Sequence, residues 1–325
     1  MENAIMRNYR IDNIKFFLIF CVVLGHSMEL FNAGGGYRII YSFHMPAFIF
    51  ISGYFAQFNR KKIISTLIYP YVLFQCLYLA FDAIIMNRNG ELLNFQFTTP
   101  YWILWYLLTL TLYNMIIPLI SNSNFLTLFS ISVLISLITG LDPSIGYYLS
   151  LARFFTFMPY FILGFGWKQI NPEALLESKI FRTINIMAAL LSCIMLGKYN
   201  FVSNPALYGS YSYINANYTF ITKGILLLCG LNWILLFMWI TPAKPIPLVS
   251  SIGKNTFVIF LFHGFIIKYM QHLGNIFIYS TFVNTCLAII ISIAIIFSLG
   301  NNCIGRIGKF IFTGKGIEAI ISFLL

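Results

Sequence analysis

Four ionisable residues share one face of the first apolar segment. On a helix advancing about 100° per residue, Asp12, Lys15, His26 and Glu29 lie at about 0°, 300°, 320° and 260°. An imidazole there could take the proton from a hydroxyl that attacks an acyl group, and Glu29 could orient it. Asp12 could pair with Lys15. The spacing predicts a catalytic centre at His26, with an interhelical hydrogen-bonding role for the imidazole as the alternative.

The composition predicts that this face lies in a membrane. Of 325 residues, 59% are hydrophobic and 9% are charged, and a water-soluble core cannot hide so much apolar sequence. The apolar runs are continuous, which favours helices. We therefore expect an all-α polytopic membrane protein of about ten transmembrane helices, forming a single domain over residues 1–325. A charge inside a bilayer costs about 2.5–3.5 kcal/mol, so the His26 face should border the bundle interior or a wet cavity.

The apolar runs and the basic gaps between them also predict a topology. The Lys and Arg residues gather in gaps on one side, which predicts cytoplasmic N- and C-termini. This placement of the net charge of +11 favours anionic lipid or an anionic cofactor over nucleic acid. About residues 300–325 should be a cytoplasmic or interfacial tail. The predicted spans are Ile14–Phe31, Ile39–Phe58, Ile63–Met86, Tyr101–Ile120, Phe125–Leu141, Ile145–Trp167, Ile180–Leu196, Tyr218–Ile240, Thr256–Leu273 and Phe277–Leu299.

A second group of residues follows the first span. Tyr41–Phe55 reads YSFHMPAFIFISGYF, in which Ser52 and Gly53 would permit close helix approach. Next come three adjacent cations that suit either a positive-inside anchor or the phosphates of a nucleotide-bearing donor: Arg60, Lys61 and Lys62. Lys198–Asn217 is rich in Tyr, Asn, Ser and Gly, which suits contact with sugars or an aromatic interface belt. The six cysteines form no CxxC pair, and we predict no metal site.

The sequence resembles the membrane-bound acyltransferase family 3, in its fucose 4-O-acetylase-like branch. IDNIKFFLIFCVVLGHS is similar to the family signature of an Asp, a basic residue, a ten-residue gap and a His, although this chain has Lys15 where the family more often has arginine. The resemblance covers about residues 10–265. Its further landmarks are FHMPAFIFISGYF, WILWYL from Trp102, RFFTFMPYFILG from Arg153 and GKNTFVIFLFH ending at His263.

The resemblance implies an O-acetyltransferase of the bacterial inner (cytoplasmic) membrane. Acetyl-CoA would bind on the cytoplasmic side as a co-substrate, and the acceptor would be a hydroxyl of a cell-envelope, capsular or exopolysaccharide sugar or of its lipid-linked precursor. His26 would be the base or a transient acyl carrier, assisted by Glu29, Lys15 and Asp12. Arg60, Lys61 and Lys62 would hold the donor. The residues expected to line the cavity are His44, Ser52, Trp105, Arg153 and His263.

Three expectations stay open at this stage. The 325 residues leave no room for the fused hydrolase-like domain of some family members, so the protein should acylate the glycan itself or pass the acyl group to a separate extracytoplasmic protein. A lipid-linked glycan carrier or flippase would use the same polar stripe without acyl chemistry, but no inverted repeat is visible. A scaffold or sensor is a third possibility. Asp82 has no evident partner in the sequence.

Overall fold

A computed structural model describes residues 8–86, 96–199, 201–274 and 280–312 of the chain. The predicted tail beyond residue 312 and the first residues of the predicted span Phe277–Leu299 lie outside these ranges. The elements, in chain order, are α1 (Tyr9–Leu30), α2 (Gly36–Tyr54), α3 (Arg60–Ile63), η1 (Ile64–Ile68), α4 (Tyr69–Ile84), η2 (Trp102–Leu104), α6 (Trp105–Ile120), α7 (Phe125–Ile138), η3 (Thr139–Leu141), η4 (Tyr148–Ser150), α8 (Leu151–Ile170), α9 (Glu173–Glu177), α10 (Lys179–Gly197), α11 (Asn204–Leu207), α12 (Tyr213–Ala216), α13 (Phe220–Ile240), α14 (Pro247–Lys254), α15 (Thr256–His272), α16 (Thr281–Leu299) and α17 (Asn302–Phe312).

Every predicted span coincides with a helical segment, and several helices begin at a side-chain cap. Asn8 accepts a hydrogen bond from the backbone N–H of Ile11, and the caps Ser178, Thr219 and Ser280 do the same for α10, α13 and α16. Such caps satisfy backbone N–H groups that have no partner within the helix. No β-strand occurs among the described residues. The chain is therefore an all-α, multi-pass membrane protein.

The described helices differ from the ten predicted spans in how many are long and apolar enough to cross a membrane. Seven of them are, and α14 with α15, bent by 74°, would make an eighth. The other two predicted spans correspond to α7, which has 14 residues, and to α2, which carries Arg38 and His44. Because α2 packs against α1, α8 and α13, it is shielded by protein and does not need a uniformly apolar surface.

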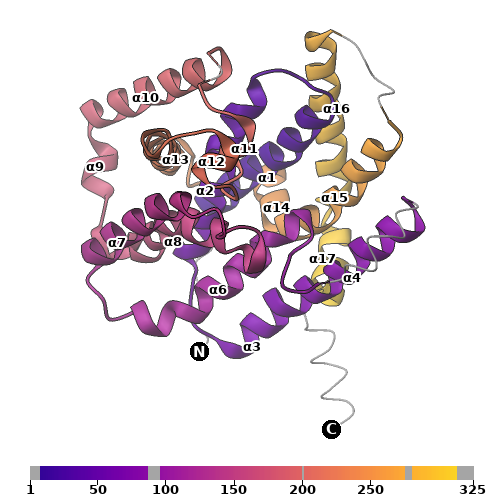
Figure 1. Cartoon of the computed structure of the whole chain (residues 1–325), viewed down its shortest axis with the longest axis horizontal. Helices are drawn as coiled ribbons and strands as arrows, with labels where there is room; N and C mark the ends of the chain where they lie inside the picture. Colours follow the sequence, from indigo (N-terminus) through magenta and orange to yellow (C-terminus); the bar gives the residue numbers. More distant parts are fainter. Residues whose placement is uncertain (1–7, 87–95, 200, 275–279, 313–325) are drawn as a thin grey trace.

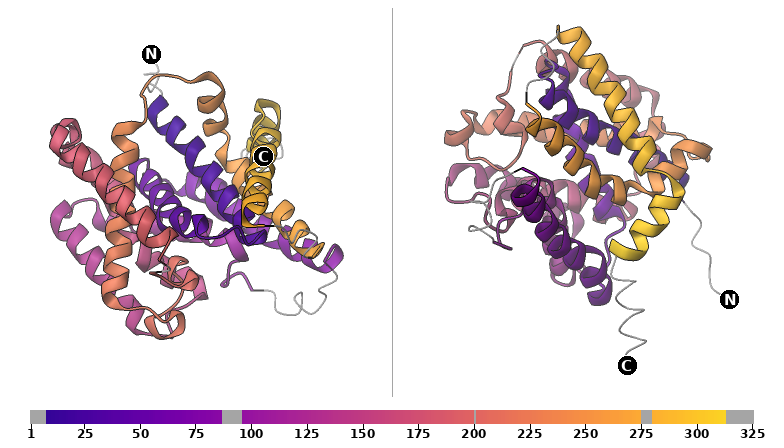
Figure 2. Two further views of the ribbon diagram at one scale, coloured as in Figure 1. Left: turned by 90° about the horizontal axis from the view of Figure 1, so that it is seen from above. Right: turned by 90° about the vertical axis from the view of Figure 1, so that its right-hand side faces the viewer.

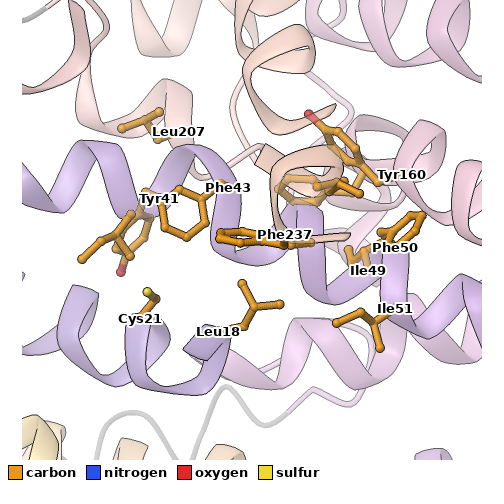
Figure 3. Packing of buried hydrophobic residues seen from close by; sticks show 14 of the residues in the cluster. Leu18, Cys21, Tyr41, Phe43, Ile49, Phe50, Ile51, Tyr160, Leu207 and Phe237 are labelled. Carbon is orange, nitrogen blue, oxygen red and sulfur yellow. The ribbon is translucent and has the colours of Figure 1, made fainter. Parts of the chain in front are cut away.

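The central pair α1 and α2 positions the site. Helices α10 and α13 lie on one side of this pair, and α15, α16 and α17 lie on the other (Figures 1 and 2). In the core, Phe43, Phe50 and Tyr41 of α2 are buried together with Leu18 of α1 and Phe237 of α13 (Figure 3). The Tyr41 hydroxyl points toward α1. The core packing thus fixes the aromatic side chain that meets the His26 face.

Two glycines allow α2 and α8 to approach closely. A Cβ atom on Gly53 would collide with the carbonyl of Phe161, and one on Gly164 would collide with the carbonyl of Phe50. Small residues at a helix crossing let the two backbones come together, as the Ser52–Gly53 pair in the sequence predicts. The close helix approach predicted at Gly53 is therefore confirmed.

Candidate active site

His26 lies near the C-terminal end of α1 in a hydrogen-bonded group with Tyr41 and Glu29. The His26 Nδ1 and the Tyr41 hydroxyl oxygen are 2.8 Å apart. The same hydroxyl donates to Oε2 of Glu29 at 3.2 Å, while Nδ1 of His26 lies 3.9 Å from that oxygen. The imidazole and the carboxylate are therefore linked through the Tyr41 hydroxyl, by two distances that are each shorter than the direct one.

The direction of these hydrogen bonds assigns a proton to Nδ1 of the imidazole. An ionised carboxylate only accepts, so Tyr41 must give its single hydroxyl proton to Glu29. The bond between Tyr41 and His26 then requires Nδ1 to carry a proton and donate it to the phenol oxygen. Nε2 of neutral His26 is left with a free lone pair, which is the form that a general base needs.

Tyr208 is a second phenol that holds Glu29 in place, and it comes from the segment between α10 and α13. Its hydroxyl donates to Oε1 of Glu29 at 2.9 Å and accepts from the Tyr37 hydroxyl at 2.7 Å. Burial is the main cause that raises the pKa of Tyr208 to about 12, so its phenol stays protonated at neutral pH. Each carboxylate oxygen of Glu29 thus accepts a hydrogen bond from a tyrosine.

His44 and His263 lie on either side of this group. The His44 ring is 4.7 Å from the Tyr41 ring, and its Nδ1 bonds the Ile40 carbonyl at 2.8 Å. The His263 ring stacks on His26 with the centroids 5.5 Å apart. Nδ1 of His263 faces two carbonyls and must donate, and its buried Nε2 has no hydrogen-bond partner within the described residues. Two imidazoles held by backbone carbonyls therefore adjoin this group, His44 next to Tyr41 and His263 next to His26.

A cavity of about 240 Å³ borders the imidazole on the side of Tyr208. Its wall is rich in rings and polar tips, including His26, Glu29, Tyr41, His44, Trp102, Trp105, Tyr147, Arg153 and Tyr208. The Trp102 ring lies 4.7 Å from the His26 ring. We name this space the upper cavity. A more polar cavity of about 380 Å³, lined by His26, Glu29, Trp102, Lys268 and Gln271, lies beside it along α15.

A cavity of about 520 Å³, which we name the lower cavity, lies toward the N-terminal end of α1. Its lining is mostly apolar, with polar groups from Lys15, Ser52, Lys62, Thr66 and Tyr106. Three side chains line both the lower and the upper cavity: Val22, Met45 and Phe260. The upper cavity, which His26 lines, and the lower cavity therefore share these three apolar side chains in their walls.

Most of the predicted site residues line one of the two cavities, but Asp12, Arg60, Lys61 and His263 line neither. Lys15, in the lower cavity, pairs with Asp12 at 3.1 Å, as their spacing predicts. Ser52 hydrogen-bonds Tyr106 there at 2.8 Å. The three adjacent cations are all exposed on α3, and of them only Lys62 lines the lower cavity. Asp82 lines neither cavity, and its Oδ2 accepts a hydrogen bond from the Tyr101 hydroxyl at 2.7 Å.

Sequence reasoning missed Tyr41 and Tyr208 as members of the site. Tyr41 lies one helical turn before His44, so the pair shares a face of α2, and that spacing was the available signal. Tyr208 carried no such signal, because it is separated from Glu29 by 179 residues. Its selection among the tyrosines of Lys198–Asn217 depends on the folding of that segment.

We expect Tyr41→Phe to reduce catalytic turnover about tenfold or more, because Nδ1 of His26 loses its link to Glu29 while Nε2 is untouched. The measurement is kcat with the donor saturating. Tyr113→Phe is the matched control, since Tyr113 donates to the Phe154 carbonyl, remote from His26. Equal losses in both variants would mean that the Tyr41 hydroxyl serves packing alone.

The comparison with protein families gives a match that covers the candidate site. The family described as an acyltransferase domain matches residues 8–300, which include every residue that lines the upper and lower cavities. No curated protein and no solved structure matches the chain. A match from the cap of α1 to the end of α16 covers far more than half of the 325 residues. The chain therefore belongs to the membrane-bound acyltransferase family 3, and the group around His26 is part of its acyltransferase domain.

Proposed function

We propose that this acyltransferase moves an acetyl group from acetyl-CoA to a sugar hydroxyl of a cell-envelope polysaccharide or its lipid-linked precursor. The observation that carries the proposal is the position of His26 in the upper cavity, with the cation-bearing lower cavity behind Val22, Met45 and Phe260. Two substrates entering from different ends would meet at one imidazole. The proposed location is the bacterial cytoplasmic membrane, with the N-terminus inside.

The lower cavity suits the donor. In the proposed orientation it faces the cytoplasm, where acetyl-CoA is available. Lys15 and Lys62 would meet its phosphates, and the apolar walls would accept its thioester arm. Exposed Arg60 and Lys61, next to Lys62 in α3, would attract the anionic nucleotide from a distance.

The upper cavity suits a sugar because both aromatic rings and polar groups line it. Trp102, Trp105 and Tyr147 offer flat apolar faces, while Tyr208 and Glu29 offer polar tips. Pockets that bind small molecules combine such an apolar lining with a few convergent polar groups. This composition supports a saccharide acceptor over a purely apolar one.

The reaction then requires one proton transfer each way. The acceptor hydroxyl gives its proton to Nε2 of His26 while its oxygen attacks the thioester carbonyl carbon. A C–O bond forms, the C–S bond breaks, and the coenzyme A thiolate leaves and takes the proton from the imidazolium. Tyr41 and Glu29 stabilise the transient positive charge through Nδ1.

Reconstitution separates this function from its rival. Purified protein in proteoliposomes receives acetyl-CoA labelled in the acetyl group together with an envelope oligosaccharide. The proposal predicts labelled O-acetyl ester on the oligosaccharide that alkaline treatment releases. Movement of the lipid-linked oligosaccharide across the bilayer without any ester would contradict it and favour a carrier.

The three apolar side chains shared by the two cavities predict selectivity for short acyl groups. We expect Met45→Ala to raise the rate with butyryl-CoA relative to acetyl-CoA about tenfold or more, because each methylene that fits or fails to fit an apolar site changes discrimination by about 1–3 kcal/mol. Competition between the two donors measures the ratio. Met158→Ala, on α8 outside both cavity linings, is the control. An unchanged ratio in Met45→Ala would show that the acyl group does not pass this point.

A further inference from the structure

Arg153 is a cation in the upper cavity whose guanidinium is held in one orientation. Its Nε donates to the Tyr208 carbonyl at 3.1 Å. The guanidinium carbon lies 4.9 Å from the Trp105 ring centroid and 5.2 Å from that of Tyr147. Arg153 also lines the same cavity as His26. A long side chain fixed in this way has already lost most of its conformational freedom before a ligand arrives.

Among the residues that the structure describes, no carboxylate forms an ion pair with Arg153. The two ion pairs on α1 join Lys15 with Asp12 and His26 with Glu29, and neither includes Arg153. Glu29 lines the same cavity, but its two oxygens already accept from Tyr208 and Tyr41. A half-buried guanidinium without a carboxylate is costly in a membrane protein, and such residues mark binding sites for substrates or ions.

We propose that the upper cavity binds an acceptor that carries an anionic group, a carboxylate or a phosphate, and that Arg153 holds this group while a neighbouring hydroxyl meets His26. The inference rests on the proposed function, because it names the class of acceptor for that site. The planar guanidinium presents paired N–H groups that match two oxygens of one carboxylate or phosphate. An acidic sugar residue or a sugar phosphate would supply that charge.

The anionic group would also position the reacting hydroxyl. Arg153 is on α8, whereas His26 is on α1, so an acceptor held at both points has its direction in the cavity fixed. Trp105 stacks on the guanidinium and would lie beside the bound sugar ring. Neutral sugars would lose this anchor and bind in several directions.

Equilibrium binding tests the inference without requiring acetyl transfer. The probes are one oligosaccharide with a glucuronate residue, its carboxyl-reduced glucose form, and the same oligosaccharide with a 6-phosphate in place of the carboxylate. Binding to the protein in nanodiscs is followed by tryptophan fluorescence and by calorimetry. We expect at least one anionic probe to bind about 10- to 100-fold more tightly than the neutral probe, since a hydrogen bond to a charged group contributes about that much. A preference for only one anion identifies the source of the charge.

Three variants complete the test. Arg153→Gln should remove the preference for the anion and leave neutral binding within about twofold, while Arg153→Lys should keep only part of the preference. Arg38→Gln removes a cation that bonds Asn204 outside the cavity linings, and it should leave the preference intact. Equal binding of all three probes to the unaltered protein, or an equal loss for every probe in Arg153→Gln, would overturn the inference. Anion-selective binding without any acetyl transfer would instead contradict the proposed function and leave the anionic site standing.

Discussion

Replacing His26 with glutamine should reduce acetyl transfer about 100- to 10,000-fold, the range that a positioned general base contributes. Glutamine keeps a polar group in reach of the Tyr41 hydroxyl, so the α1 and α2 contact has a substitute partner. Its amide cannot accept a proton from the acceptor hydroxyl at neutral pH. The loss should therefore appear in kcat, with little change in the affinity for acetyl-CoA.

The matched control for this variant is His272→Gln in the last turn of α15. His272 is exposed and does not line either cavity, so its replacement should leave the rate unchanged. Thermal unfolding of both variants in detergent shows whether they fold as the parent does. A folded His26→Gln protein that keeps more than a tenth of the parent rate would rule out His26 as the base.

The second large effect concerns the crossing of α2 and α8. Gly164→Leu should destabilise the fold by more than about 3 kcal/mol, because the added side chain meets the Phe50 backbone, which cannot move aside as a side chain can. The expected result is loss of the monodisperse peak in size-exclusion chromatography, or a Tm lowered by many degrees. Gly224→Leu on α13 is the control, because a Cβ at Gly224 meets nothing within 4 Å. Equal stability of the two variants would contradict the close crossing.

This crossing also affects the site, because α2 carries Tyr41 and His44, and α8 carries Arg153. A displacement of the two helices would change the width of the upper cavity. A conservative Gly164→Ala variant that still folds should therefore lose acceptor binding before it loses donor binding. The comparison of the two affinities separates this effect from general unfolding.

Local pattern was enough to predict the helices and the polar face of α1. Continuous apolar runs mark each helical segment, and the 100° rotation per residue places Lys15 beside Asp12 and Glu29 one turn from His26. These are contacts within one helix. They depend on the spacing in the sequence and not on how the helix docks.

Contacts between helices could not be predicted in the same way. Tyr41 reaches His26 only because α2 packs along α1, and Tyr208 reaches Glu29 from a segment that folds over the helix ends. Rotation along α3 likewise brings Lys62 to the lower cavity and leaves Arg60 and Lys61 outside its lining, although the three are adjacent in sequence. Because neighbouring residues on a helix point about 100° apart, adjacent charges in the sequence need not line the same cavity.

The most direct measurement of the central claim is a structure of the protein with a non-hydrolysable acetyl-CoA analogue. The account predicts the nucleotide at the end of the lower cavity near Lys62 and the thioester arm between Val22, Met45 and Phe260. The acetyl carbonyl carbon of the analogue should lie within a few ångströms of His26. An acceptor oxygen hydrogen-bonded to Nε2 would then lie about 3–3.5 Å from that carbon. An analogue bound with its acetyl group away from these three side chains and remote from His26 would contradict the account.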